Sequence, residues 1–229
     1  MERLYFVAQP RLLSSPSMSQ LLPYTEKPRV DAADRALILT EAARLFRENG
    51  YERTTVRQIA NACGLLPGSL HYRYPAKEAI LLDMMKVAIE LTIRAVLEAT
   101  APINDPLQKL RAAIQAHIQT LLSGNNIFYV LLFEWRSLSG EAREAMLAER
   151  DRYENYWATL LDTLKVKGYI RPEVDLDMLR LIGLGALNWV ATWYREGGRY
   201  TKEQIGEMVW TVLMSGVLVT QRDQEGYSA

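Results

Sequence analysis

The feature that most constrains the fold is a helical spacing of apolar residues, which begins near Asp31 and continues through nearly all of the remaining chain. Ile38, Ala42 and Phe46 recur every four residues, a spacing that places them on one face of a helix. Apolar residues at the same spacing recur in further segments, which are separated by Gly, Asn and Pro residues that end helices. These segments predict helices at 55–63, 67–74, 77–100, 105–122, 126–138, 140–167, 175–196 and 202–221. No segment shows the alternation of a half-buried strand. We therefore predict an all-α protein of about nine helices.

The predicted helices divide the chain into three parts. Residues 1–30 hold four prolines and a serine cluster without helical period, so we expect a mobile tail, and both Met1 and Met18 are open as starts. Short helices separated by tight turns follow over 31–76, and longer helices fill 77–229. This order predicts a small N-terminal module that rests on a larger helical domain.

Composition indicates the cellular compartment of the protein more clearly than its binding partner. Lys and Arg together number 27, as do Asp and Glu, so the net charge is zero and gives no general indication of a nucleic-acid partner. A single cysteine, Cys63, excludes an intrachain disulfide. No apolar run approaches the roughly 20 residues of a membrane helix. We expect a cytoplasmic protein that does not associate with membranes.

The stretch TTVRQIANACGLLPGSLHYRY, residues 54–74, has the pattern of a helix-turn-helix. Thr55 and Gln58 have the spacing of a capping box, and Gly64 can take the left-handed conformation that a tight turn needs. A unit of this kind places its second helix in the major groove of DNA. Four basic residues and one acidic residue lie between Glu52 and Lys77, which favours contact with phosphates.

We expect a group of small, polar or basic residues, which the predicted core does not need, to contact double-stranded DNA. They are Thr54, Thr55, Arg57, Pro67, Gly68, Ser69, His71, Tyr72, Arg73 and Lys77. Ser, His, Tyr and Arg side chains can bond base edges or phosphates, and Gly68 permits a close approach to DNA. For Lys77, a solvated surface lysine remains the open alternative.

Residues Ala36 to Leu82 resemble the TetR family of transcriptional regulators. The residues that carry the resemblance are the ending PAKEAIL and the frame of Phe46, Gly50, Tyr51, Thr54, Thr55, Val56, Ile59, Ala60 and Gly64. The resemblance implies that Thr55 caps the second helix and contacts phosphate. It also implies that Ser69 and Tyr72 face the groove, and that Lys77 holds the DNA backbone. The larger domain would bind a small effector and form a homodimer.

Three positions depart from the family pattern. His71 stands where many members have a tyrosine, and Arg73 stands where a second tyrosine is common. Leu66 occupies the position of a serine that often caps the recognition helix. The usual phosphate-contacting tyrosine is therefore replaced here by His71 or Tyr72, and the operator sequence does not carry over from relatives.

The larger domain offers candidate effector-binding residues. The stretch Leu184 to Val209 is similar to TetR-type regulators of fatty-acid and steroid catabolism, several of which respond to acyl-CoA thioesters. Aromatic residues with a few polar groups can line an apolar pocket between helices. The expected pocket residues are His117, Phe128, Trp135, Arg136, Tyr153, Trp157, Asn188 and Trp189. The alternative, in which the aromatic residues fill the core or the dimer seam and His117 is a core or surface residue, stays open.

The last two predicted helices carry apolar and small residues that suit a two-fold four-helix interface. The expected interface residues are Leu181, Leu184, Gly185, Ile205, Met208, Val209, Val212 and Leu213. A dimer would place two recognition helices about 34–36 Å apart, which is one turn of DNA.

Catalytic motifs are absent from the sequence. It holds no GxSxG, HExxH, P-loop or glycine-rich dinucleotide fingerprint, and two histidines with one cysteine supply a metal site poorly. We expect no cofactor and no enzyme activity. The expected function is that of a DNA-binding repressor released by a small hydrophobic or acyl-CoA-type effector. A helical interaction module without DNA binding is the alternative, and an enzyme on a helical scaffold is the least favoured.

Overall fold

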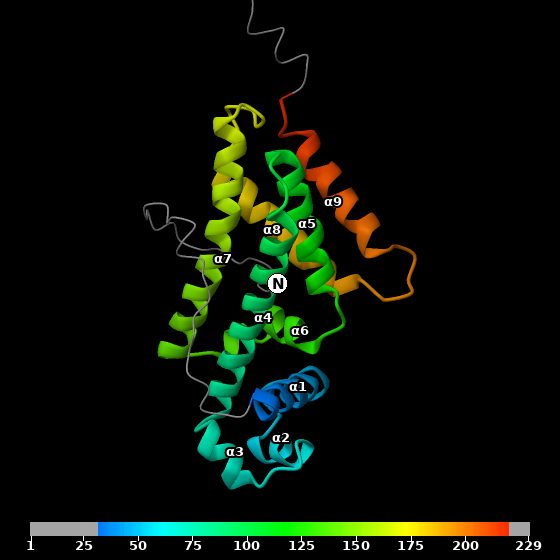
Figure 1. Cartoon of the computed structure of the whole chain (residues 1–229). Helices are drawn as coiled ribbons and strands as arrows, with labels where there is room; N and C mark the ends of the chain where they lie inside the picture. Colours follow the sequence, from blue (N-terminus) through cyan, green and yellow to red (C-terminus); the bar gives the residue numbers. More distant parts are fainter. Residues whose placement is uncertain (1–31, 220–229) are drawn as a thin grey trace, which may run out of the picture.

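The computed structural model describes residues 32–219, which form nine α-helices and one short 3-10 helix (Figure 1). The elements are α1 (Ala32–Asn49), α2 (Val56–Ala62), α3 (Pro67–Arg73), α4 (Lys77–Thr100), α5 (Pro106–Leu121), α6 (Asn126–Phe133), η2 (Trp135–Ser137), α7 (Gly140–Val166), α8 (Leu176–Trp193) and α9 (Lys202–Ser215). Within the described range the only extended pairing is an isolated bridge between Ile170 and Leu218. The all-α prediction is confirmed, whereas the predicted tail lies outside the described residues.

Side-chain caps explain where several helices begin. Asp105 accepts a hydrogen bond from the Gln108 backbone N–H at 2.8 Å, with Pro106 in the first helical position, as the sequence predicted. A capping box joins Thr55 and Gln58 at the start of α2, and a second one joins Thr201 and Gln204 at the start of α9. Each cap satisfies a backbone donor that the helix leaves open.

Three helices end earlier than the sequence predicted. Helix α6 ends at Phe133, because Glu134 leaves the helical conformation (φ −108°, ψ 0°) before η2 begins. Helix α8 ends at Trp193, since Tyr194 is extended. The chain after α9 runs beside the α7–α8 connection, where Arg171 N–H donates to Val217 O and Val219 N–H donates to Tyr169 O, each at 3.0 Å. This pairing takes the place of the last predicted helical turn.

Helices α1, α2 and α3 form a small module at one end of the molecule (Figure 1). Phe46, Ile59 and Leu70, one from each helix, have no exposed surface and make the centre of its core. Gly64 turns the chain between α2 and α3 in the left-handed conformation, with φ +67°. The predicted helix-turn-helix geometry is therefore present, and α2 and α3 share one apolar interior.

An ion pair and a phenol join the α1–α3 module to the long helix α4. The Asp83 carboxylate of α4 accepts a hydrogen bond from Arg35 Nε of α1 at 2.9 Å, and from the Tyr74 hydroxyl after α3 at 2.6 Å. Burial disfavours the charged carboxylate, but the bonds from Arg35 and Tyr74 outweigh it and lower the pKa of Asp83. One carboxylate thus fixes three segments relative to one another.

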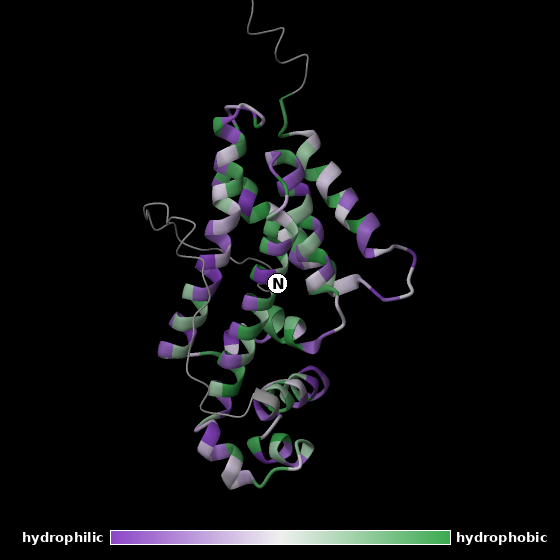
Figure 2. Ribbon diagram, in the orientation of Figure 1, coloured by the Kyte–Doolittle hydropathy of each residue, from purple (hydrophilic) through white to green (hydrophobic). Residues whose placement is uncertain are grey.

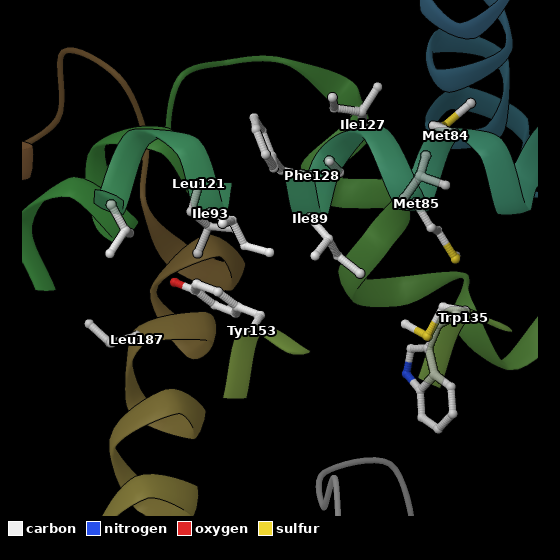
Figure 3. Close-up of a cluster of buried hydrophobic side chains, with 14 of the residues drawn as sticks. Met84, Met85, Ile89, Ile93, Leu121, Ile127, Phe128, Trp135, Tyr153 and Leu187 are labelled. Carbon is white, nitrogen blue, oxygen red and sulfur yellow. The ribbon is translucent and has the colours of Figure 1, made fainter. Parts of the chain in front are cut away.

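Helix α4 leads from this module into a bundle with α5, α6, α7, α8 and α9 (Figure 1). Hydrophilic and hydrophobic residues alternate along α7, as expected for a helix with one face in the core (Figure 2). Buried side chains from α4, α5, α6, α7 and α8 form one continuous core, part of which appears in Figure 3. Since α4 contributes to that core and also holds Asp83, a single helix spans both parts of the molecule.

Replacing Gly64 with alanine should lower the free energy of unfolding by about 1–2 kcal/mol, because a Cβ is strained at positive φ. Chemical denaturation followed by circular dichroism measures the change. The matched control is Gly68→Ala in α3, where an added Cβ meets no atom within 4 Å and φ is ordinary. An equal loss in both variants would contradict the proposed role of Gly64.

Candidate DNA-binding surface and effector site

The outer side of α2 and α3 presents most of the predicted DNA-binding residues. The exposed members of the predicted set are Thr55, Arg57, Pro67, Gly68, Ser69, His71 and Tyr72. Tyr72 is 92% exposed, whereas Leu70, two residues earlier on the same helix, is fully buried in the core of the module. We call these seven residues the α2–α3 polar surface. It offers hydroxyl, imidazole, phenol and guanidinium groups on two helices held by one core.

Thr54 is not part of this surface, which corrects the sequence prediction. Its side chain is 1% exposed, and its hydroxyl donates to the carbonyl oxygens of Leu45 at 3.2 Å and Gly50 at 2.9 Å. The hydroxyl therefore fastens the α1–α2 connection and is not available to DNA.

Two predicted phosphate-binding residues have partners within the protein. Arg73 pairs with Asp34 of α1 at 2.6 Å. The Lys77 ammonium donates to the Tyr51 carbonyl oxygen at 2.7 Å and lies 4.1 Å from the centre of the Tyr51 ring. Lys77 therefore ties the start of α4 to the α1–α2 connection, so the alternative of a purely solvated lysine is wrong.

Further exposed residues of this region, among them Leu66 and Asn61, were not among the predicted DNA-binding residues. Leu66 is 76% exposed at the start of α3, and α3 has no side-chain cap, as the departure from the family pattern predicted. Asn61 is exposed on α2, one helical turn after Arg57. The four-residue spacing of Arg57 and Asn61 would have placed both residues on one helix face.

Three of the predicted effector-binding residues meet inside the bundle. The His117 Nδ1 atom of α5 lies 2.6 Å from the Tyr153 hydroxyl of α7. The Trp157 ring stands edge-on to both rings, with centroids 6.0 Å from each. A side-chain hydrogen bond also joins Asn188 of α8 to His117, and another joins Trp157 to Tyr153. We call His117, Tyr153 and Trp157 the buried polar cluster.

Burial decides the protonation of this cluster. It lowers the pKa of His117 to about 4, although Asn188 opposes the shift, and it raises the pKa of Tyr153 far above its usual value. At neutral pH the imidazole is therefore uncharged and the phenol keeps its proton. His117 is therefore a buried core residue, as the open alternative allowed.

A small cavity lies beside Trp157, between α5, α7, α8 and α9. Its lining is formed by Leu110, Ile114, Trp157, Leu161, Leu179, Arg180, Gly183, Leu184, Leu187, Leu213 and Met214. The volume of about 30 Å³ is that of roughly one water molecule, whereas pockets for drug-sized ligands measure about 300–1,000 Å³. The cavity is therefore too small for a ligand of that size.

The remaining predicted effector residues do not join this site. Phe128 is buried in α6, and Trp135 lies apart from Tyr153 in the core cluster (Figure 3). Arg136 is exposed, with its guanidinium 4.9 Å from the centre of the Trp135 ring. Trp189 is 51% exposed on α8. The expected pocket is thus divided between the buried polar cluster, the α6–η2 region and the surface.

Some residues of the predicted dimer face lie on the surface of the subunit. Gly185, Met208 and Val212 are exposed, whereas Ile205 is buried within the subunit, where α9 packs on α5. Leu184 and Leu213 line the cavity instead, and Leu181 and Val209 are half-buried.

Sequence reasoning missed three exposed apolar residues of α8. Met178, Ile182 and Trp193 fall in one stripe with Gly185 and Trp189. Their spacing of four, three, four and four residues was readable as one helix face. We call these five residues, with Met208 and Val212 of α9, the α8–α9 apolar face.

The pKa of His117 predicts a pH dependence of stability. The unfolded chain takes up a proton on this histidine below about pH 6.5, and the folded chain does so only near pH 4. Stability is therefore complete above pH 6.5 and falls as the pH drops from 6.5 towards 4. Between pH 7.5 and 5.5 we expect a loss of about 1–2 kcal/mol in urea denaturation.

His117→Gln should remove most of that loss, and His71→Gln, which changes the exposed second histidine, should retain it. The measurements use one fixed protein concentration. The same pH dependence in His117→Gln as in the unchanged protein would show that His117 is not the responsible group.

None of the helices within 32–219 has the length and apolar character to cross a membrane. Across the same residues, no three His, Cys, Asp or Glu side chains are grouped so that they could hold a metal ion.

The chain matches two family models along most of its length. Residues 38–84 match the model of bacterial regulatory proteins of the tetR family. Residues 104–217 match the tetracyclin repressor-like C-terminal domain.

Three relatives illustrate the similarity. AibR, solved in complex with isovaleryl coenzyme A and operator DNA, is 30% identical, with 79% of this chain and 98% of AibR covered and a TM-score of 0.73. The HTH-type transcriptional repressor KstR2 of Mycobacterium tuberculosis is 27% identical over 188 residues, which are 80% of this chain and 92% of KstR2. The fatty acid metabolism regulator protein of Bacillus subtilis is 25% identical over 181 residues, with 79% and 93% covered.

These matches confirm the resemblance on both sides of α4, in the helix-turn-helix region and in the C-terminal bundle. The chain belongs to the TetR family of transcriptional regulators.

Proposed function

We propose that this protein is a sequence-specific DNA-binding repressor, which a small acyl effector releases from its operator. The observation that carries the proposal is the α2–α3 polar surface, presented by a rigid helix-turn-helix at one end of a family fold. AibR, which is 30% identical, was solved with both operator DNA and an acyl coenzyme A, and KstR2 is a repressor. Residues 31–76 would serve as the DNA-binding domain, and residues 77–229 as the effector and dimer domain.

Contact with DNA would follow from the arrangement of α2 and α3. Helix α3 would enter the major groove with Ser69, His71 and Tyr72 towards the bases and phosphates. Arg57 and Thr55 on α2 would meet the DNA backbone. Lys77 would act indirectly, because its ammonium already holds the α1–α2 connection in position.

Effector binding would act on α4. Opening the cavity displaces α7, α8 or α9 from α5, and α7 is linked to the start of α4. The Glu78 carboxylate of α4 accepts hydrogen bonds from the Ser139 N–H at 2.6 Å and from its hydroxyl at 2.9 Å. A shift of the first turn of α7 would therefore move α4, and with it Asp83 and the α1–α3 module. The effector weakens DNA binding only if it binds the shifted state more tightly.

The α8–α9 apolar face would form the homodimer seam. Large exposed apolar side chains such as Ile182, Trp189 and Val212 are costly on a monomer surface. Gly185 has no atom within 4 Å of an added Cβ, so α8 offers an open strip at its centre. A second copy of the same face would cover these residues and pair two recognition helices across one turn of DNA.

We further propose that the chain is a regulator rather than an enzyme, because the relatives that it matches along most of its length are transcriptional regulators. A repressor of chromosomal operators works in the cytoplasm. The alternative of an interaction module without DNA binding predicts no specific retardation of operator DNA.

Arg57→Ala should weaken binding to DNA from upstream of the protein's own gene across all tested salt concentrations. The slope of log affinity against log salt should fall by about one, as expected for one lost phosphate contact. Electrophoretic mobility shift at several salt concentrations measures both quantities. The matched control is Arg94→Ala, which removes an exposed arginine of α4, away from the α2–α3 polar surface, and should leave the slope unchanged. Absence of specific retardation by the folded dimer would overturn the DNA-binding proposal.

Ile182→Glu should convert the dimer to a monomer, because two glutamates would face one another in an apolar seam. Light scattering after gel filtration should give the 26.1 kDa mass of one chain for the variant, and twice this mass for the unchanged protein. Val166→Glu places the same charge on an 87% exposed valine at the end of α7 and should remain dimeric. A dimeric Ile182→Glu would exclude this face as the seam.

A further inference from the structure

The exposed leucine that precedes α3 is not explained by the core of the α1–α3 module. Leu66 lies in the turn between α2 and α3, at the end of the molecule away from the bundle, and it is 76% exposed (Figure 1). Its neighbours supply the apolar contacts of this region, since Leu65 packs against the core and Leu70 is fully buried. Leu66 therefore contributes little to the stability of the module by burial.

Leu66 also leaves its helix without a cap. It holds the N-cap position of α3, where a Ser, Thr, Asp or Asn side chain accepts a hydrogen bond from a backbone N–H of the first turn. Leucine has no acceptor, and α3 has no side-chain cap. Single exposed apolar residues are common on protein surfaces, so exposure alone assigns no role. The place of this residue, and what can meet it there, decide its role.

Backbone hydrogen bonds hold the turn against both helices. The Leu65 N–H donates to the Ala60 carbonyl oxygen of α2 at 2.8 Å. The Leu66 carbonyl oxygen accepts from the Ser69 N–H at 2.9 Å and from the Leu70 N–H at 3.2 Å. Leu66 is therefore carried by the same rigid unit as Ser69, which belongs to the α2–α3 polar surface.

Leu66 and Pro67 form an apolar margin beside the hydroxyl and imidazole groups of this surface, and we call these two residues the apolar edge. Both are exposed. Gly68 follows, and an added Cβ there would meet no atom within 4 Å, so the backbone beside the edge is open to a close approach. In a helix-turn-helix, the residues that open the second helix reach the edges of base pairs in the major groove. In the proposed complex with DNA, the apolar edge would therefore face base pairs.

The major groove offers one apolar group to such an edge. Every base pair presents hydrogen-bond donors and acceptors there, and thymine alone adds a 5-methyl group. A leucine that covers donors and acceptors removes water from them and supplies no hydrogen bond in return, which costs affinity. When a leucine covers a thymine methyl, both apolar groups leave water, which is favourable. The chemistry of the apolar edge thus favours thymine over the other three bases.

We infer that Leu66, with Pro67 beside it, binds the 5-methyl group of a thymine in each half-site of the operator. The inference rests on the proposed function and names one base that the DNA-binding surface requires. Leu66 is then a specificity-determining residue, because it recognises a methyl group, whereas Ser69 and His71 can recognise only groups that form hydrogen bonds.

Replacing thymine with deoxyuridine removes only the 5-methyl group and so tests this contact directly. Selection from random double-stranded DNA gives the bound sequence, and each thymine of its half-sites is then replaced singly by dU. Fluorescence anisotropy with the full-length protein at one salt concentration measures the affinities. At one position, dU should lower the affinity about threefold to fivefold in one half-site, and about tenfold or more in both, because each change removes one buried methyl group.

Leu66→Ser removes the leucine and can restore a cap to α3, so we expect this variant to fold. Its affinities for thymine and dU at that position should be equal, and its response to dU at other positions should not change. The matched control is Val166→Ser, which removes an 87% exposed apolar side chain at the end of α7 and should keep the preference for thymine. The readout is the ratio of two affinities of one variant, so a general change in DNA affinity cancels.

Three results would overturn the inference alone. Specifically bound half-sites without thymine would contradict it, as would equal affinities for thymine and dU at every position. A dU effect that persists in Leu66→Ser would assign the methyl contact to another residue. Absence of all sequence-specific binding by the folded protein would instead overturn the DNA-binding proposal, and the inference with it.

Discussion

The Asp83 carboxylate is the contact on which the rest of the structure depends. It lies on α4 and holds Arg35 of α1 and Tyr74 after α3. It stays ionised despite partial burial because both partners donate to it. Lys77 and Glu78, in the first turn of α4, bind the α1–α2 connection and the start of α7. The first two turns of α4 therefore connect the polar surface to the bundle, and the same unbroken helix of 24 residues contributes to the bundle core. A displacement inside the bundle has a continuous mechanical route to α3.

The structure also defines the state from which an effector would act. The cavity beside Trp157 is too small for an acyl chain. Opening the bundle costs packing, and the new apolar burial of a bound acyl chain would offset that cost. Part of the binding free energy would then drive a displacement of α7 or α8, and only the remainder would be measured as affinity. Because α8 carries the apolar face on its other side, the same movement would reach the dimer seam and change the spacing of the two recognition helices.

Local patterns were sufficient for much of the fold, and they failed where tertiary contacts decide. Helical spacing, the Asp105 cap and the Thr55–Gln58 box predicted the helices and most of their starts. They could not show that Thr54 turns inward to two carbonyl oxygens, or that Lys77 lies on the Tyr51 ring. The aromatic residues of the larger domain were predicted to share one pocket, yet Trp135 is buried just after α6 and Trp189 is exposed on α8. Composition identifies candidate pocket residues, whereas the packing of α5 against α7 and α8 selects among them.

We expect effector binding in the bundle to be reciprocally coupled to DNA binding at the α2–α3 polar surface. The most direct measurement is the operator affinity of the dimer with and without saturating octanoyl-coenzyme A, together with the affinity for octanoyl-coenzyme A with and without operator. Thermodynamic linkage requires the two ratios to be equal, and typical couplings are about 5–150-fold. We predict that bound octanoyl-coenzyme A lowers the affinity for operator DNA, and that bound operator lowers the affinity for octanoyl-coenzyme A, by the same factor within this range. An operator affinity that stays unchanged when octanoyl-coenzyme A is bound would contradict the account.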